Sequence, residues 1–220
     1  MRQLLLVRPE PGLSASAERA RQAGLDVICC PLFRIDPLEW ELPDPNGYDG
    51  LLLTSANALR YGGSKLGDLK SLPVHAVGAA TADAARAAGL EVATVGESDL
   101  TDLLTKLPVE KRLLHLAGDD HRQAATRHRI DRRIIYRSAP IEQPGLPPID
   151  GLVVAVHSPR AGARLAELED QRARTAIAAI SVAAANATGG GWERVEIAER
   201  PNDSSLLALA ASLCHTSPPR

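Results

Sequence analysis

Aromatic residues, cysteine and long hydrophobic runs are all scarce in this sequence of 220 residues. Aromatic side chains make up 3% of the chain, although hydrophobic residues together make up 45%. The core must therefore consist mainly of Ala, Leu and Val, which suit helices packed on a parallel sheet. No apolar run approaches the roughly 18 residues of a membrane-spanning helix, so we expect no contact with a membrane.

The sequence also has no excess of positive charge. Lys and Arg number 25 against 27 Asp and Glu, for a net charge of −2, and no basic stripe of the kind that binds nucleic acid is visible. The amino-terminal stretch MRQLLLVRPEPG has a short apolar core before Arg8 and two prolines, which indicates a strand and not a signal peptide. We expect a cytoplasmic protein without a nucleic-acid partner.

Cysteine is represented by Cys29, Cys30 and Cys214. Their spacing matches no metal-binding motif, and the adjacent pair would point to opposite faces of a strand. We interpret the three as reduced and mostly buried thiols; a reactive role for one of them is the minor alternative.

Cofactor and metal motifs are missing as well. The sequence has no GxGxxG after a strand, no Walker loop and no Gly-x-Ser-x-Gly turn. His115, Asp119, Asp120 and His121 could suggest a metal site, but one strand residue and one loop do not converge on an ion without a further ligand. We therefore predict neither a metal nor a cofactor.

What the sequence does contain is an alternation of short apolar runs with helical patterns, typical of parallel sheets covered by helices. The expected strands are 4–7, 26–30, 50–53, 74–77, 91–95, 113–116, 133–136, 152–156, 176–180 and 193–198. So many strands indicate two sheets.

An internal repeat shows how the strands divide. The segment DGLLLTSANALR at 49–60 matches DGLVVAVHSPRAGARL at 150–165, and each is followed by another strand, a helix and an acidic turn. Asp99 in one turn and Asp203 in the other could each cap a last helix. A third correspondence pairs the strand at 4–7 with that at 113–116.

The repeat predicts two α/β domains, the second inserted into the first. Residues 1–34 and 145–220 form the discontinuous first domain, and 42–134 form the inserted one. The connecting segments 35–41 and 135–144 are rich in proline with alternating apolar positions. We expect them to be linker strands that together make a two-stranded hinge ladder.

Small polar residues stand where strands end and helices begin: Ser55, Asn57, Thr81, Ser158 and Ser181. In open α/β sheets these junctions share one edge, where helix amino ends attract anions. Each residue could simply cap its helix, for about 1 kcal/mol, but their clustering favours a shared ligand cleft. No nucleophile–base pair or carboxylate dyad stands out, so an enzyme here would act by holding a reactive substrate in shape.

Several motifs, weak one by one, form a specific ordered set. They are TSANAL at 54–59, AVGAATADAARAAGL at 76–90, LAG at 116–118, YR at 136–137, HSPRA at 157–161, and AERP at 198–201 followed by LLALAASL at 206–213. In this order and spacing the chain resembles the uroporphyrinogen-III synthase family along nearly its whole length.

The resemblance implies two flavodoxin-like parallel-sheet domains and a cofactor-free, cytoplasmic lyase of tetrapyrrole biosynthesis. The sequence leaves the oligomeric state open, and we expect a monomer. Such an enzyme closes hydroxymethylbilane to uroporphyrinogen III, with loss of water and inversion of ring D, through an azafulvene and a spiro intermediate. The substrate carries acetate and propionate arms on every pyrrole. Backbone amides at helix amino ends would bind these carboxylates.

The resemblance also suggests residue roles. Tyr136 matches the family's tyrosine at the domain crossing and is the candidate proton donor for the leaving hydroxyl; packing of the hinge is its alternative role. The candidate substrate-binding residues are Arg8, Ser55, Asn57, Thr81, Ser158 and Ser181. The chain departs from the family pattern where Val7 and His157 replace threonines and where Ser181 begins a stretch that lacks the usual Gly and Thr.

A function of another class, binding without catalysis, is also compatible with the sequence. A non-catalytic two-domain hinge protein that binds a polycarboxylate metabolite would need the same crevice and the same hinge. The two readings differ in whether supplied hydroxymethylbilane is turned into the inverted isomer.

Overall fold

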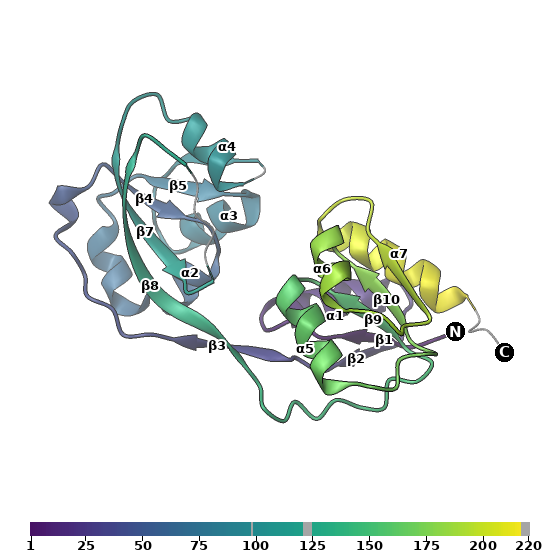
Figure 1. Ribbon diagram of the computed structural model, residues 1–220. Helices are drawn as coiled ribbons and strands as arrows, with labels where there is room; N and C mark the ends of the chain where they lie inside the picture. The colour runs from purple at the N-terminus through teal and green to yellow at the C-terminus, as the bar shows by residue number, and fades with distance from the viewer. Residues whose placement is uncertain (98, 121–124, 217–220) are drawn as a thin grey trace. The chain divides into compact units, whose positions relative to one another are not determined.

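The computed structural model describes residues 1–97, 99–120 and 125–216 (Figure 1). It consists of two compact units. Met1–Arg34 and Ala139–Arg220 form the first unit, and Ile35–Ser138 form the inserted unit.

The first unit is built on a parallel sheet in the order β11-β10-β9-β1-β2. The strands are β1 (Leu4–Leu6), β2 (Val27–Cys29), β9 (Val153–Val156), β10 (Ala176–Ala179) and β11 (Arg194–Ile197). The helices are α1 (Gly12–Gln22), α5 (Pro159–Leu168), α6 (Val182–Ala187) and α7 (Asp203–His215).

Alternation along these strands sends side chains into two separate cores. Leu4 and Leu6 pack with α1 and α7 on one face, whereas Leu5 packs with α5 and α6 on the other. Because both faces are covered, the central strands are apolar at every position, as expected of a buried parallel sheet.

The inserted unit carries a sheet in the order β3-β8-β7-β4-β5-β6. Its strands are β3 (Phe33–Pro37), β4 (Gly50–Leu53), β5 (Val74–Val77), β6 (Val92–Gly96), β7 (Arg112–Gly118) and β8 (Arg129–Pro140). Its helices are α2 (Asn57–Tyr61), α3 (Ala79–Ala87) and α4 (Leu100–Thr105), with 3-10 helices η1 (Pro45–Gly47) and η2 (Gly63–Leu69).

Two cores again lie on opposite faces of this sheet. Leu51 and Leu53 pack with α2, η2 and α3. Leu52 packs with the leucines of α4 on the other face.

The predicted fold class is confirmed: two parallel-sheet α/β units, one inserted into the other. Every expected strand is present, and β3 is added from a segment partly assigned to a linker. β8 is much longer than the expected 133–136 because it continues through the second crossing. The exact linker bounds, 35–41 and 135–144, stay a prediction.

The two crossings form the expected ladder. β3 lies beside β8 in the sheet. The Leu38 N–H donates to the Ile135 carbonyl at 2.9 Å, and the Ile141 N–H donates to the Leu32 carbonyl at 2.9 Å. Residue numbers rise on one strand as they fall on the other, so the crossing strands run antiparallel.

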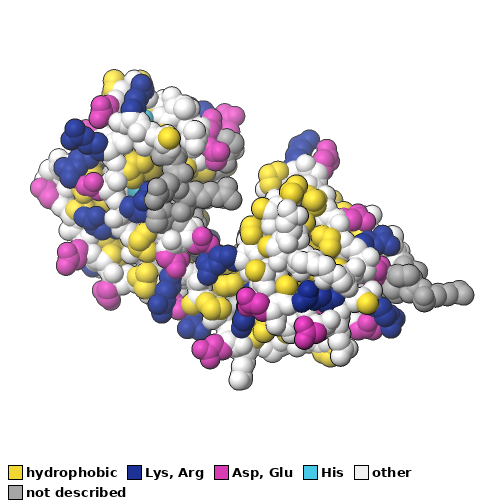
Figure 2. Space-filling view, viewed as in Figure 1, with side chains coloured by type: hydrophobic (Ala, Val, Ile, Leu, Met, Phe, Trp, Pro, Cys, Tyr) yellow, Lys and Arg dark blue, Asp and Glu magenta, His cyan; other side chains and the backbone are white. Residues whose placement is uncertain are grey.

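Charge is mixed on the surface. On the face drawn in Figure 2, Lys and Arg side chains lie among Asp and Glu over both units without merging into one basic patch of described residues. Within the described ranges, no helix has both the length and the apolar character needed to cross a membrane.

Candidate functional site

In each unit the predicted site residues gather at the carboxyl edge, where the parallel strands end. In the first unit, Arg8 follows β1, Ser158 follows β9 and Ser181 follows β10, and these strands are neighbours in the sheet. The sequence expectation that these junctions share one edge is therefore met within this unit.

Ser158 and Ser181 both cap helices. The Ser158 Oγ accepts the Ala161 N–H of α5 at 3.2 Å, and the Ser181 Oγ accepts the Ala184 N–H of α6 at 3.3 Å. A hydroxyl that accepts in this way keeps its own proton for a further hydrogen bond. Capping and ligand binding are thus compatible at these positions.

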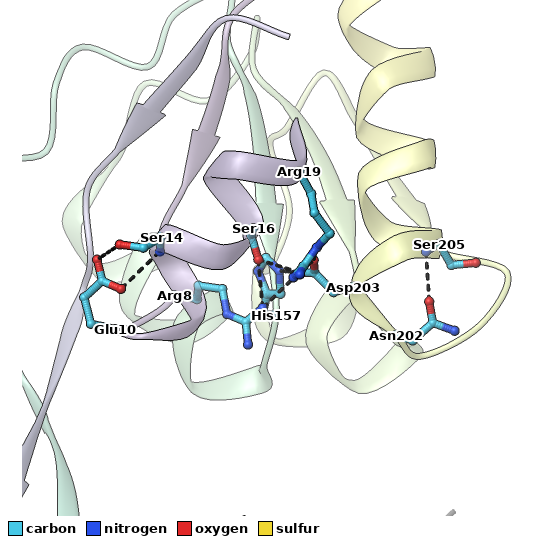
Figure 3. A network of polar contacts seen from close by, with 9 residues as sticks. All are labelled: Arg8, Glu10, Ser14, Ser16, Arg19, His157, Asn202, Asp203 and Ser205. Carbon is cyan, nitrogen blue, oxygen red and sulfur yellow. Dashed lines mark hydrogen bonds and ion pairs between the residues drawn. The ribbon is translucent and has the colours of Figure 1, made fainter. Parts of the chain in front are cut away.

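The centre of this edge is Asp203, the first residue of α7, on which four side chains converge (Figure 3). Its Oδ1 accepts from Arg8 Nη1 at 2.9 Å, Ser16 Oγ at 2.6 Å and His157 Nε2 at 2.7 Å. Its Oδ2 accepts from Arg19 Nη2 at 2.6 Å. One carboxylate therefore ties α1, α7 and the ends of β1 and β9 together.

The suggestion that Asp203 caps α7 was wrong. The cap is Asn202, whose Oδ1 accepts the Ser205 N–H at 2.9 Å. In the inserted unit Asp99 does cap its helix, by accepting the Asp102 N–H at 2.9 Å.

The network sets the charges of its members. Burial alone would raise the pKa of the Asp203 carboxyl, but hydrogen bonds from His157, Ser16 and Arg19 outweigh it and hold the pKa far below its usual value. Burial lowers the pKa of His157 despite its contact with Asp203. At neutral pH His157 is therefore uncharged and donates to the carboxylate through Nε2.

Gly12 makes room for Arg8. A Cβ at Gly12 would lie 2.5 Å from both Nε and Nη2 of the Arg8 guanidinium, so any side chain there would displace Arg8 from Asp203. The guanidinium remains partly open to solvent, with 28% of the Arg8 side chain exposed.

In the inserted unit the predicted residues follow β4 and β5. The Ser55 Oγ accepts the Asn57 N–H at 3.2 Å. Asn57 begins α2, and its Oδ1 accepts from Arg60 Nη1 at 3.2 Å. Thr81 lies in the first turn of α3 and is buried, with 6% exposed.

The start of α3 differs from the capped helices of the first unit. Its N-cap residue is Gly78, with a φ of 78°, and in the described part of the chain no side chain caps this helix. Ala79 and Ala80 are exposed. The first N–H groups of this helix are therefore accessible at the carboxyl edge, where they favour an anion.

Tyr136 on β8 reaches the same edge. Burial raises the pKa of its phenol, and the neighbouring Ser55 and Gly118 oppose this shift only in part. The Tyr61 ring lies 5.8 Å away, centroid to centroid. A Cβ at Gly118 would lie 2.5 Å from the Tyr136 ring, so this glycine of the LAG motif is what allows the ring to lie close to β7.

A second polar contact at this edge was not predicted. His115 on β7, considered above only as a possible metal ligand, is fully buried. Its Nε2 lies 3.1 Å from Thr54 Oγ1, and the Arg132 Nε donates to its Nδ1 at 3.3 Å. The signal available in the sequence was the alternation of β7, which places His115 on an interior face.

Among the described residues, no three His, Cys, Asp or Glu side chains gather to hold a metal ion; His121 lies outside these residues. Cys29 is exposed, whereas Cys30 and Cys214 are buried. Burial raises the pKa of the Cys30 thiol, and that of Cys214 to about 11, which keeps both protonated and unreactive.

Comparison with known proteins identifies a family that matches most of the chain. The family model described as uroporphyrinogen-III synthase HemD matches residues 14–208. No curated protein sequence matches.

Two solved structures share the fold. The uroporphyrinogen-III synthetase of Helicobacter pylori is 20% identical, with a TM-score of 0.68 over 97% of this chain and 100% of that one. A mutant uroporphyrinogen III synthase of the extremely thermophilic bacterium Thermus thermophilus is 21% identical, with a TM-score of 0.55 over 96% of this chain and 98% of that one.

Proposed function

Because the chain belongs to the uroporphyrinogen-III synthase family, we propose that it holds hydroxymethylbilane while this substrate closes to uroporphyrinogen III. The activity is that of a lyase of tetrapyrrole biosynthesis. Water leaves the substrate, the ring closes, and ring D is inverted.

The observation that carries the residue assignment is the position of the partly buried Tyr136 phenol at the carboxyl edge of the inserted unit. The raised pKa of the Tyr136 phenol keeps it protonated at neutral pH, so it has a proton to give. The phenol lies beside Gly118 and the Tyr61 ring. This position supports Tyr136 as the donor that protonates the hydroxyl group that leaves as water.

Each carboxyl edge has groups that can bind carboxylate arms of the substrate. In the inserted unit, the uncapped start of α3 beside Thr81 and the hydroxyl of Ser55 supply donors, with Asn57 next to them. In the first unit, Ser158 and Ser181 retain a hydroxyl proton each, and Arg8 supplies a positive charge that Asp203 orients. Neutral donors with one cation suit a flexible substrate that must bind through many arms and still be released.

Catalysis then rests mainly on geometry. Hydroxymethylbilane can close unaided to the uninverted isomer, so the protein must bring the reactive end of the chain to the substituted carbon of ring D. Holding two reacting groups in place can lower the activation barrier by about 7–11 kcal/mol. One proton donor typically has a smaller effect, a rate increase of roughly 10²- to 10⁴-fold.

The test is to supply hydroxymethylbilane and resolve the product isomers. The proposed function requires predominantly uroporphyrinogen III, formed faster than the spontaneous product. A non-catalytic binding protein for polycarboxylates would leave the uninverted isomer as the product and slow its formation only by sequestering the substrate.

A monomeric state, a cytoplasmic location and the lack of any metal or cofactor remain predictions. The last is checked by exhaustive chelation and dialysis, after which activity should persist. Activity that is lost on chelation and restored only by an added ion would contradict the prediction that no metal is needed. His115 and Asp119 would then be candidate metal ligands.

A further inference from the structure

A chain of polar side chains, with the fully buried His115 at its centre, crosses three neighbouring strands of the inserted unit. His115 on β7 is the Cα partner of Leu52 on β4 and of Arg132 on β8. Thr54 lies two residues beyond Leu52, so strand alternation gives it the same face as Leu52 and His115. The register therefore brings Arg132, His115 and Thr54 into line toward the carboxyl edge.

The contacts fix the protonation state of His115. The guanidinium of Arg132 can only donate, so Nδ1 of His115 must accept the Arg132 Nε–H, 3.3 Å away. A ring whose Nδ1 accepts is neutral and carries its proton on Nε2. That proton is donated to Thr54 Oγ1 at 3.1 Å.

The consequence concerns the hydroxyl of Thr54. Its oxygen accepts from His115, so its own proton must point elsewhere. Thr54 is only partly buried and directly precedes Ser55, whose hydroxyl accepts the Asn57 N–H at the start of α2. A carboxylate accepts hydrogen bonds and cannot donate them, so it is the partner that this hydroxyl fits.

We propose that His115 is a positioning residue: held in its neutral Nε2–H form by Arg132, it presents the Thr54 proton to a carboxylate arm of the substrate. This inference rests on the function proposed above, in which the inserted unit's carboxyl edge holds hydroxymethylbilane. It adds Thr54 to the binding groups and gives a function to a histidine that is fully buried.

A second histidine provides a matched comparison. His75 on β5 is also a Cα partner of Leu52 and is 3% exposed. Within the described residues, neither of its ring nitrogens has a hydrogen-bond partner. His75 therefore fills space on the same face without directing a hydroxyl, and His75→Leu serves as the control.

The experiment measures KM and kcat for hydroxymethylbilane in Thr54→Val, His115→Leu and the double variant. Loss of one hydrogen bond to a charged group corresponds to a roughly tenfold rise in KM, with kcat changed much less. We expect this rise in each single variant and no further rise in the double variant. His75→Leu should leave KM unchanged.

A readout without turnover comes from nitrogen NMR of the wild-type imidazole. It should show His115 protonated on Nε2 alone near neutral pH, and it remains decisive where His115→Leu fails to fold. A proton on Nδ1 would overturn the inference, as would unchanged KM values in an active Thr54→Val variant. Wild-type protein that makes no uroporphyrinogen III would overturn the proposed function, and the inference with it.

Discussion

The carboxyl edges of the two units arise from the same sequence repeat but are built with different chemistry. In the first unit the edge is organised by charge: Asp203 receives hydrogen bonds from Arg8, Ser16, Arg19 and His157. In the inserted unit the groups at the edge are neutral: the Tyr136 phenol lies beside Gly118, and the His115 imidazole, which accepts from Arg132 on the next strand, meets Thr54. The two edges are therefore suited to different tasks.

A partly buried carboxylate depends on its partners, because a charge left without them is costly where the dielectric constant is low. The side chain of Asp203 is 18% exposed, and the network leaves the guanidinium groups of Arg8 and Arg19 partly open to a ligand, with 28% and 48% of their side chains exposed. Neutral hydroxyls can exchange partners at little cost and can give up or share a proton. We infer that the first unit anchors the substrate and that the inserted unit carries out the chemistry.

The two units also differ in how helices cover their sheets. In the first unit two helices cover each face of the sheet, whereas in the described part of the inserted unit α4 alone packs on the Leu52 face. Two histidines, His75 and His115, are buried on strands at this face, and His128 Nε2 lies 3.1 Å from the Leu104 carbonyl of α4. The inserted unit thus buries imidazoles where the first unit buries aliphatic side chains.

The largest expected effect comes from removing the centre of the charged edge. Asp203→Ala leaves Arg8, Arg19 and His157 without their shared acceptor, so we expect the free energy of unfolding of the first unit to fall by about 3–5 kcal/mol. Urea unfolding can be followed unit by unit, because Trp192 is buried in the first unit and Trp40 in the inserted unit. A Trp40→Phe background reports on the first unit and a Trp192→Phe background on the inserted one.

The control is Asp150→Ala, which removes the exposed ion pair between Asp150 and Arg174 in the same unit. Such pairs contribute about 0–1 kcal/mol. Equal losses in Asp150→Ala and Asp203→Ala, or a loss reported equally by both tryptophans, would show that the network does not stabilise the first unit in particular.

A smaller effect, confined to the inserted unit, depends on pH. Burial, reinforced by repulsion from Lys111 and His128, lowers the pKa of His75 from 6.5 to about 4. The unfolded chain takes up this proton more readily than the folded one, so the stabilisation is complete above pH 6.5 and is lost as pH falls toward 4. The expected loss is at most about 3 kcal/mol.

The measurement is the free energy of unfolding reported by Trp40 between pH 7 and pH 4, in the wild type and in His75→Leu. The variant should lose less stability over this interval. Identical pH profiles would mean that another group accounts for the acid sensitivity of the inserted unit.

The smallest effect concerns the cap serines of the first unit. Ser158→Ala removes the acceptor for the Ala161 N–H, which should cost about 1 kcal/mol of stability. If the remaining hydroxyl proton also binds substrate, KM should rise as well, whereas Asn202→Ala at the start of α7 should reduce stability alone. Unchanged KM in a folded Ser158→Ala variant would leave this serine with a capping role only.

Much of the fold could be predicted because it depends on local patterns. Buried runs such as 50–53 and 74–77 show the apolar continuity of parallel strands, and the repeat of 49–60 at 150–165 revealed the insertion. The bounds of β8 could not be predicted in this way. It extends over residues 129–140, where half-exposed polar residues and a ladder with β3 replace the buried apolar run.

The site was predictable only in part, for a related reason. Residues that follow strands, such as Ser55 and Ser158, could be placed by topology alone. Asp203 lies 195 residues from Arg8 along the chain, and nothing in the local sequence distinguishes an acidic residue that caps a helix from one that binds two arginines. His157 was visible as a departure from the family pattern, but its partner became clear only in three dimensions.

The division of labour between the two edges is tested most directly by steady-state kinetics with product isomers resolved, comparing Tyr136→Phe with Arg8→Gln. We predict that Tyr136→Phe lowers kcat by roughly a hundredfold or less, still yields the inverted isomer and leaves KM nearly unchanged. Arg8→Gln should raise KM with kcat preserved in the folded fraction. The opposite pattern, with kcat lost in Arg8→Gln and retained in Tyr136→Phe, would contradict the assignment of chemistry to the inserted unit.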